Sequence, residues 1–164
     1  MKNEGSGADN RSLIARWDSP AKYGEGPPPQ GGVLVGCHNE NGLRSNNRWM
    51  DCIIEFTNSP YHVLLLQETH LSQQDCVKAE NMCRARGIAS VFTHRADDAP
   101  REGTAIMVKC RRLGLSADDI TFASACDSKA CTASFVHEGK PEHICCVYLP
   151  STVPETSAVL QYVK

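Results

Sequence analysis

The chain has 164 residues, 41% of them hydrophobic, and a formal net charge of -2 at pH 7. This length is enough for one domain with its own core, and the near-neutral charge excludes a globally basic nucleic-acid binder. No apolar run approaches the length of about 18 residues that indicates a transmembrane helix.

Nine cysteines is a high and odd number for a chain of this length. The N-terminal residues lack the apolar core of a signal peptide, so we interpret the cysteines as reduced thiols. No Cys-x-x-Cys pair is present, which makes a zinc site the weakest interpretation. We therefore expect a nuclear or cytoplasmic protein that is neither secreted nor attached to a membrane.

The first 31 residues are polar and rich in glycine and proline, with three consecutive prolines at 27–29. They offer few large apolar side chains to offset the entropy of ordering, so we predict a disordered N-terminal segment over 1–31. A single domain is predicted over 32–164.

Two apolar runs, 33–37 and 63–66, predict buried strands. The second run is apolar without alternation, which suits a central strand covered on both faces. Between them a helix is predicted, with Ser45 as its N-cap and its end near Thr57. Its apolar face would consist of Met50, Ile53 and Ile54.

A second helix is predicted from Ser72, whose hydroxyl can cap it, to Gly87. Strands are predicted over 88–93 and 103–108, with a loop between them.

The last third of the chain predicts two more strands, 131–136 and 144–148, joined by a hairpin turn at 138–141. A final helix would begin at Pro154. The alternation of strands and helices, followed by a meander, predicts an α/β fold with a mixed sheet.

Each of the two buried strands leads into a polar side chain. Asn39 follows the first strand, in Asn-Glu-Asn-Gly-Leu, and Glu68 follows the second, in Leu-Gln-Glu-Thr-His-Leu. Open α/β sheets place their ligand sites at the carboxyl ends of their strands. We therefore expect these two side chains to converge.

Glu68 is a candidate Mg²⁺ ligand, because Mg²⁺ prefers carboxylate oxygens and leaves room for a phosphate. The amide of Asn39 could orient a water molecule or bind a phosphate oxygen. Two structural interpretations stay open: Glu68 caps the next loop or pairs with an arginine, and Asn39 forms an Asx turn before Gly42. Asn41 has the same two interpretations.

Other candidate residues carry weaker signals. Tyr148, at the end of the last strand, could donate a hydrogen bond to a phosphate oxygen or be an ordinary half-buried strand tyrosine. His70 could touch a substrate or lie on a surface loop. Six arginines form either a local basic patch or a set of solvated side chains: Arg84, Arg86, Arg95, Arg101, Arg111 and Arg112.

Taken in order, four segments resemble the endonuclease/exonuclease/phosphatase superfamily, nearest to the endonuclease domains of non-LTR retrotransposons and to apurinic/apyrimidinic endonucleases. Residues 39–43 are similar to the family's Asn-x-Asn/Asp-Gly-Leu, and residues 66–71 to its Leu-Gln-Glu-Thr-x-Leu. Gly-Thr-Ala-Ile-Met-Val at 103–108 and Val-Tyr-Leu-Pro-Ser at 147–151 resemble its Gly-x-Ala-Ile and Tyr-x-Pro-Asn segments. The likeness covers about residues 33–164.

This resemblance implies a four-layer α/β sandwich and Mg²⁺-dependent cleavage of phosphate esters, with Mn²⁺ as an alternative ion. It implies that Glu68 is a catalytic metal ligand, that Asn39 and Tyr148 are catalytic residues at the phosphate, and that DNA is the partner. Asn41 would support the site or contact the DNA backbone. Ser151 stands where the family has asparagine and would lie at the substrate.

The family's Gly-Asp-x-Asn and Ser-Asp-His motifs, which supply the water-activating Asp and the phosphate-binding His, do not occur in the chain. We therefore interpret it as the N-terminal fragment of a retroelement-derived endonuclease domain, inactive alone and lacking its C-terminal half. Half a sandwich would leave the inner face of its sheet bare, which costs on the order of 10 kcal/mol. For this reason we expect aggregation or a molten state unless another chain supplies the missing sheet.

Two other functions stay open. The first is another phosphoesterase of the same superfamily, such as an inositol phosphatase or a sphingomyelinase-like enzyme. The second is a non-catalytic remnant that binds nucleic acid through its arginines.

Overall fold

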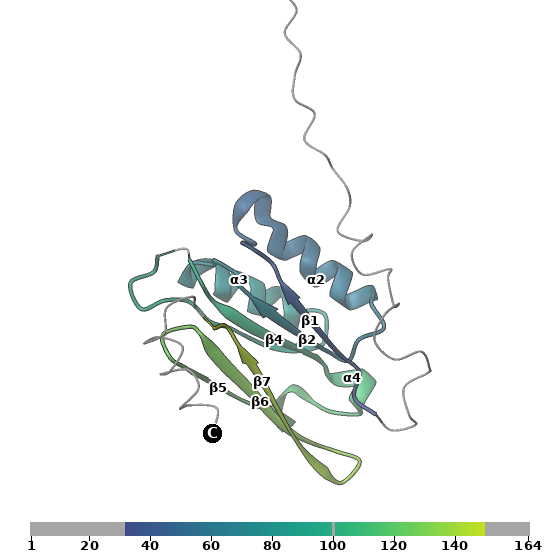
Figure 1. Cartoon of the computed structure of the whole chain (residues 1–164). Coiled ribbons are helices and arrows are strands. Elements are labelled where there is room, and N and C mark those ends of the chain that lie inside the picture. Colours follow the sequence, from purple (N-terminus) through teal and green to yellow (C-terminus); the bar gives the residue numbers. More distant parts are fainter. Residues whose placement is uncertain (1–31, 100, 150–164) are drawn as a thin grey trace, which may run out of the picture.

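The computed structural model describes residues 32–99 and 101–149. The predicted disordered segment 1–31 and the predicted helix from Pro154 lie outside the described residues. Within the described part the chain forms three layers: a pair of helices, a four-stranded sheet and a three-stranded sheet (Figure 1). The predicted α/β class, with helices on the outer face of a mixed sheet, is confirmed.

The first sheet contains β1 (Val35–Asn39), β2 (Val63–Gln67), β3 (Ile88–Phe92) and β4 (Thr104–Lys109), in the order β1-β2-β4-β3. β1 and β2 run parallel, while β4 runs antiparallel to both of its neighbours. All four strands were predicted, although β1 begins two residues later than the apolar run at 33–37. The parallel pair matters most for function, because it sets two strand ends side by side.

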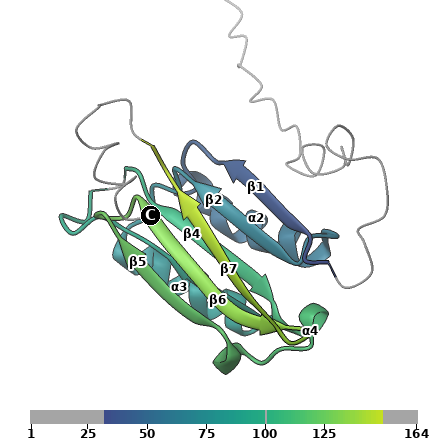
Figure 2. The ribbon, with the colours of Figure 1, turned by 60° about the horizontal axis from the view of Figure 1, so that its bottom comes forward.

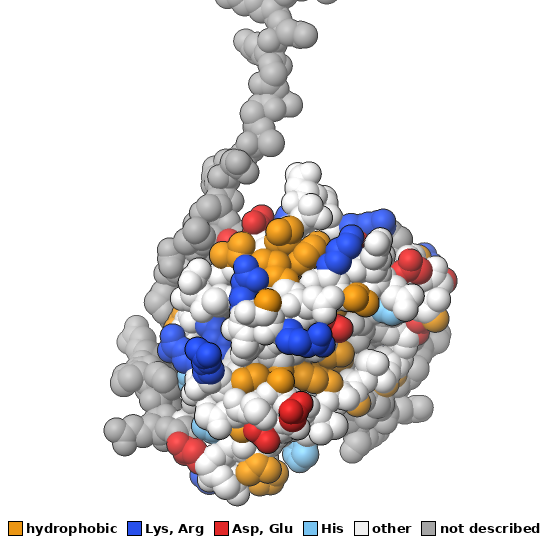
Figure 3. Space-filling model, turned by 180° about the vertical axis from the view of Figure 1, so that it is seen from behind, with side chains coloured by type: hydrophobic (Ala, Val, Ile, Leu, Met, Phe, Trp, Pro, Cys, Tyr) orange, Lys and Arg blue, Asp and Glu red, His pale blue; other side chains and the backbone are white. Residues whose placement is uncertain are grey.

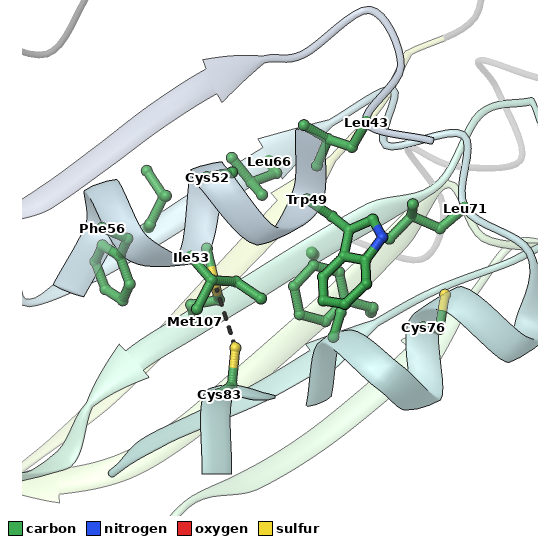
Figure 4. Close-up of a cluster of buried hydrophobic side chains, with 14 of the residues drawn as sticks. Leu43, Trp49, Cys52, Ile53, Phe56, Leu66, Leu71, Cys76, Cys83 and Met107 are labelled. Atoms are coloured by element: carbon green, nitrogen blue, oxygen red, sulfur yellow. Dashed lines mark hydrogen bonds between the residues drawn. The ribbon is translucent and has the colours of Figure 1, made fainter. Parts of the chain in front are cut away.

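Helices α2 (Arg48–Asn58) and α3 (Gln73–Arg84) cover one face of this sheet. The indole of Trp49 and the side chains of Ile53 and Phe56 reach from α2 into a core shared with the sheet (Figure 4). Leu64 and Leu66 meet them from β2, and Cys83 comes from α3. These side chains are all buried, so this layer is well packed.

The start of the first helix differs from the prediction. Ser45 is not its N-cap: residues Ser45–Asn47 form a short 3-10 turn (η1), and Asn47 precedes α2 with a positive φ of 54°. The predicted apolar face is also partly wrong, because Met50 and Ile54 are exposed. The buried stripe follows the spacing i, i+3, i+4, i+7 of an amphipathic helix, and it consists of Trp49, Cys52, Ile53 and Phe56.

The start of α3 was predicted correctly. The hydroxyl of Ser72 accepts a hydrogen bond from the backbone N–H of Asp75 at 3.2 Å. This satisfies one of the donors that a helix N-terminus leaves open.

The second sheet contains β5 (Thr121–Ala125), β6 (Ala130–His137) and β7 (Lys140–Val147), paired antiparallel in that order. It follows two short segments, α4 (Cys110–Leu113) and η2 (Ala117–Asp119). β6 and β7 form the predicted hairpin, whose turn residues Glu138 and Gly139 both have positive φ, as a two-residue hairpin turn requires. β5 was not predicted, because Thr-Phe-Ala-Ser-Ala carries too few large apolar residues.

The two sheets pack face to face around a second core that includes Val63, Ile106, Val108, Phe135 and Cys146. The predicted bare inner face is therefore wrong for β2 and β4, which the second sheet covers. The expected aggregation or molten state stays a prediction. The argument for it is weaker, because the second sheet buries apolar surface that we expected to be exposed. Among the described helices, none is long and apolar enough to cross a membrane.

Burial of cysteine thiols in these cores gives stability a defined pH dependence. Burial raises the pKa of Cys76 and of Cys83 from 9.0 to about 12. Because the folded pKa is raised, the contribution of each thiol to stability is complete below pH 9 and is lost as pH rises toward 12. The Cys83 thiol also contacts the sulfur of Met107 at 3.6 Å.

We predict that the free energy of unfolding falls between pH 8 and about pH 10.5, by about 2 kcal/mol for each of the Cys76 and Cys83 thiols. Cys83→Val should remove the share of this fall that belongs to one thiol while filling the same space. The measurement is urea unfolding at the two pH values under reducing conditions, with Cys37→Ser at an exposed position as control. Equal pH slopes in wild type and Cys83→Val would contradict the assignment.

Candidate functional site

The ends of β1 and β2 lie side by side, because the parallel register pairs Asn39 with Gln67. Glu68 is the next residue beyond this pair. The amide Nδ2 of Asn39 donates a hydrogen bond to Oε1 of Glu68 at 3.0 Å. The two side chains that we expected to converge, from positions 29 apart in sequence, are thus in direct contact.

The amide of Asn39 is held at both ends. Its Oδ1 accepts a hydrogen bond from the backbone N–H of Asn41 at 3.1 Å, which is the Asx turn left open as an interpretation. The turn and the contact with Glu68 are therefore both present. Because Oδ1 is occupied by the backbone, the Nδ2 donor is the end that faces the carboxylate.

The loop that carries Glu68 has a demanding backbone. Glu68 and His70 both have left-handed φ values, 53° and 54°, which non-glycine residues rarely adopt. On one side the turn after β1 holds this loop, since Gly42 N–H donates to Glu68 O and Leu43 N–H donates to Thr69 O, each at 2.8 Å.

The other side of the loop is held by the residues before β4. Thr69 N–H donates to the carbonyl of Gly103 at 3.1 Å, and His70 N–H donates to that of Glu102 at 2.7 Å. Gly103 has a φ of 94°, and a Cβ there would lie 2.4 Å from Oγ1 of Thr69. Only glycine fits at this position, so the Gly-x-Ala-Ile segment contributes to the placement of Glu68.

His70 does not extend freely from a surface loop, because its ring packs beside the candidate site. A Cβ on Gly42 would come within 3.1 Å of its Nδ1 atom, so the imidazole ring lies against the backbone of the 39–43 turn. The ring is half-buried. This position makes a contact with a bound substrate geometrically reasonable.

A buried carboxylate supports the 39–43 turn from the helix side, and sequence reasoning missed it. Glu40 is 3% exposed, with its Oε1 2.9 Å from Nδ1 of His38 and its Oε2 3.7 Å from Arg48. Arg48 also donates to the carbonyl of Gly42 at 2.8 Å. Nothing in the spacing of these residues indicated the cluster, because Glu40 stands within a motif read for its asparagines.

A chain of contacts links Tyr148 to the end of the sandwich where Glu68 lies. Its backbone N–H donates to the carbonyl of Lys129 at 2.8 Å, and the ammonium of Lys129 is 3.2 Å from Glu102, the residue that holds the His70 backbone. Glu102 also pairs with Arg95 at 2.9 Å. Sequence reasoning missed this ionic cluster, because its members are far apart along the chain.

The six arginines do not form one patch. Arg84 and Arg86 precede β3, and Arg111 and Arg112 follow β4, where Ile88 pairs with Lys109. Arg95 and Arg101 lie at the opposite end of the same strands, about 15–20 Å away. On the face shown in Figure 3, lysine and arginine side chains accordingly stand in separate groups between apolar ones.

Arg95 in particular is not a free cation. It contacts Asp97, Glu102 and Asp127 at 3.0, 2.9 and 3.5 Å, and its hydrogen bond to Asp97 lowers the pKa of that carboxyl to about 2. These three carboxylates balance its positive charge, at the same end of the strands as Glu68.

The remaining site predictions divide as follows. Asn41 is exposed beside Asn39, with a left-handed φ of 48°, and Ser151 lies outside the described residues. Within 32–99 and 101–149, no three or more His, Cys, Asp or Glu side chains are grouped to hold a metal ion. A cation at Glu68 would therefore complete its coordination with water, phosphate or groups from elsewhere.

Comparison with known proteins identifies solved structures that have a similar fold. No family model and no curated protein matches the chain. Among solved structures, the chain is similar to AP endonuclease LMAP from Leishmania major, with 16% identity, a TM-score of 0.54, and coverage of 93% of this chain and 52% of that one. It is also similar to the Xenopus laevis APE2 catalytic domain, with 16% identity, a TM-score of 0.50, and coverage of 79% and 49%.

At this level of identity the likeness concerns the fold, so the chain has the α/β sandwich fold of AP endonuclease domains. It spans about half the length of the two structures that it matches. The family resemblance of the sequence motifs and the fold of the structure thus agree.

The role of Gly103 can be tested with a matched glycine. Gly103→Ala should lower the free energy of unfolding by about 3 kcal/mol, from left-handed strain plus the clash with Thr69. Gly114→Ala has a similar φ of 68° but an empty surrounding, so it should lose only the strain, about 1 kcal/mol. Urea unfolding of both variants measures the difference. Equal losses would show that Gly103 does not clamp the Glu68 loop.

Proposed function

We propose that the chain is the N-terminal part of a Mg²⁺-dependent domain that cleaves phosphodiester bonds in DNA, and that it derives from a retroelement endonuclease. The observation that supports this most is the contact between Asn39 and Glu68 at the ends of two parallel strands. The fold shared with AP endonucleases supports the same proposal. A nuclear or cytoplasmic location belongs to it as well.

The donor groups at this site fit a hard divalent cation. Asn39 occupies Oε1 of Glu68, and Oε2 has no hydrogen-bond partner among the described residues, so one carboxylate oxygen is available to a metal. Mg²⁺ takes one or two carboxylates and keeps its remaining positions for water and phosphate. When bound, it would polarise a phosphate oxygen and neutralise developing charge.

The residues of the chain would then have separate tasks. Glu68 holds the cation, and Asn39 fixes the rotamer of Glu68 through the hydrogen bond from Nδ2. Tyr148 is proposed to donate a hydrogen bond to the phosphate in the transition state, and Asn41 and Ser151 to contact the substrate backbone. Such fixed donors act without reorganising during the reaction, which is the source of their rate effect.

The chain by itself lacks two parts of this chemistry. A general base for the attacking water and a histidine for the phosphate are each worth orders of magnitude in rate, and the motifs that carry them in the family are absent from the sequence. We therefore propose that the chain is inactive alone and acts with a C-terminal half.

A second candidate function is favoured by four arginines. The described contacts give Arg84, Arg86, Arg111 and Arg112 no carboxylate partner within salt-bridge distance, and they lie at the end opposite Glu68. A non-catalytic nucleic-acid-binding remnant would use this end. Its binding would weaken with salt and survive Glu68→Ala. No observation favours an inositol phosphatase or sphingomyelinase-like enzyme.

Metal binding at Glu68 can be measured without any turnover. We predict that the chain binds Mn²⁺, followed as loss of the free-ion signal in electron paramagnetic resonance, and that Mg²⁺ competes. Glu68→Gln should weaken binding by about tenfold or more, because a charged ligand is lost. Glu138→Gln, an exposed carboxylate in the β6–β7 turn, is the control. Identical Mn²⁺ binding by the two variants would exclude Glu68 as the ligand.

The genomic DNA downstream of codon 164 tests the origin and the incompleteness together. We predict that it encodes Gly-Asp-x-Asn and Ser-Asp-His, in the same frame or after a frameshift. A chain extended by that segment should nick supercoiled plasmid with Mg²⁺, whereas the 164-residue chain should give no product above background. Unrelated downstream sequence, or nicking by the short chain, would count against the proposal.

A further inference from the structure

Glu40 stands between two asparagines of the candidate site, yet its side chain lies on the opposite face of the sheet. Its backbone N–H donates to the carbonyl of Gln67 at 2.9 Å, so the alternation of side chains along β1 continues to this residue. Asn39 points toward Glu68, whereas Glu40 is buried on the helix side. Figure 2 shows α2 on this side, behind β1 and β2 and away from β6 and β7.

The helix layer meets this carboxylate through Arg48, the first residue of α2. Nη2 of Arg48 is 3.7 Å from Oε2 of Glu40, and its Nη1 donates to the carbonyl of Gly42 at 2.8 Å. One guanidinium therefore holds the turn after β1 at two points. Burial raises the pKa of the Cys52 thiol on α2, and the Glu40 carboxylate raises it further, which agrees with a carboxylate beside the helix.

The points that Arg48 holds lie next to the groups that orient Glu68. Gly42, which bonds Arg48 through its carbonyl, donates its own N–H to the carbonyl of Glu68 at 2.8 Å. Asn41, the residue before it, donates its N–H to Oδ1 of Asn39 at 3.1 Å. That bond leaves Nδ2 of Asn39 facing the Glu68 carboxylate. A change in the turn therefore reaches both the backbone and the carboxylate of Glu68.

The turn needs this support from the helix. Asn41 has a left-handed φ of 48°, and strained backbone persists only where its surroundings hold it. A buried carboxylate that loses its partner cation is strongly unfavourable. Loss of Arg48 would therefore drive Glu40 toward solvent and move the turn with it.

We propose that Glu40 and Arg48 are positioning residues of the Glu68 site. From the helix face they fix the orientation of the Asn39 amide, and they thereby set the affinity of Glu68 for a divalent cation. The cation rests on the proposed function, whereas the orientation of the amide stands without it. Neither residue touches the cation or the substrate in this assignment.

The direction of the effect separates positioning from simple electrostatics. Removing a positive charge near a cation site should by itself strengthen Mn²⁺ binding. If Arg48 positions the site, Arg48→Met should instead weaken Mn²⁺ binding, by about tenfold. Arg44→Met is the matched control, because Arg44 also follows the turn but pairs with Asp75, at 3.8 Å. This control should bind Mn²⁺ as tightly as the wild type or slightly more tightly.

A double variant protects the test if the unpaired carboxylate prevents Arg48→Met from folding, as judged by circular dichroism. Glu40→Gln combined with Arg48→Met removes one charge of each sign, so electrostatics predicts an unchanged Mn²⁺ affinity. Loss of the turn contacts predicts a weakening of about tenfold. Unchanged or tighter Mn²⁺ binding by the double variant would overturn the proposal, and so would an equal weakening by Arg44→Met.

A measurement without metal separates this proposal from the proposed function. The side-chain amide resonance of Asn39 in a heteronuclear NMR spectrum, identified by its loss in Asn39→Ala, reports the hydrogen bond to Glu68. It should shift in the double variant and stay in place in Arg44→Met. If the wild-type chain binds no Mn²⁺, the cation assignment fails and this shift decides the positioning role. An unchanged resonance in the double variant would overturn that role while leaving a Mn²⁺ result for the wild type intact.

Discussion

The site depends on the parallel pairing of β1 with β2. Because both strands run in the same direction and in register, their carboxyl ends meet, and the residues just past each end become neighbours. The hydrogen bond between Asn39 and Glu68 follows from this pairing. An antiparallel arrangement would have placed the two side chains at opposite ends of the sheet, about 15 Å or more apart.

The parallel strand direction does not by itself orient the Glu68 carboxylate. Its orientation also depends on a strained backbone in the loop after β2. Glu68 and His70 adopt left-handed conformations that cost free energy. They are held by backbone hydrogen bonds from the turn after β1 and from the segment before β4. Gly103 permits the close approach of these segments, so a residue 35 positions from Glu68 in sequence shapes the site without touching a ligand.

The second sheet gives the inner face of the first sheet a packed core. Three strands suffice to cover β2 and β4, and the core between the sheets contains side chains from both. The cover ends at β7, which leaves β1 partly exposed on its inner face.

The sequence by itself determined the α/β class, the four strands of the first sheet, the cap at Ser72 and the convergence of Asn39 with Glu68, because apolar periodicity and strand-end position act locally. It did not determine which stripe of α2 is buried, the existence of β5, or the ionic cluster of Arg95, Glu102 and Lys129. Those depend on contacts between residues far apart in the chain. Tertiary structure alone decided that the second sheet covers β2 and β4 but not β1, since the offset of two packed sheets is set by how their side chains interlock rather than by either strand's own sequence.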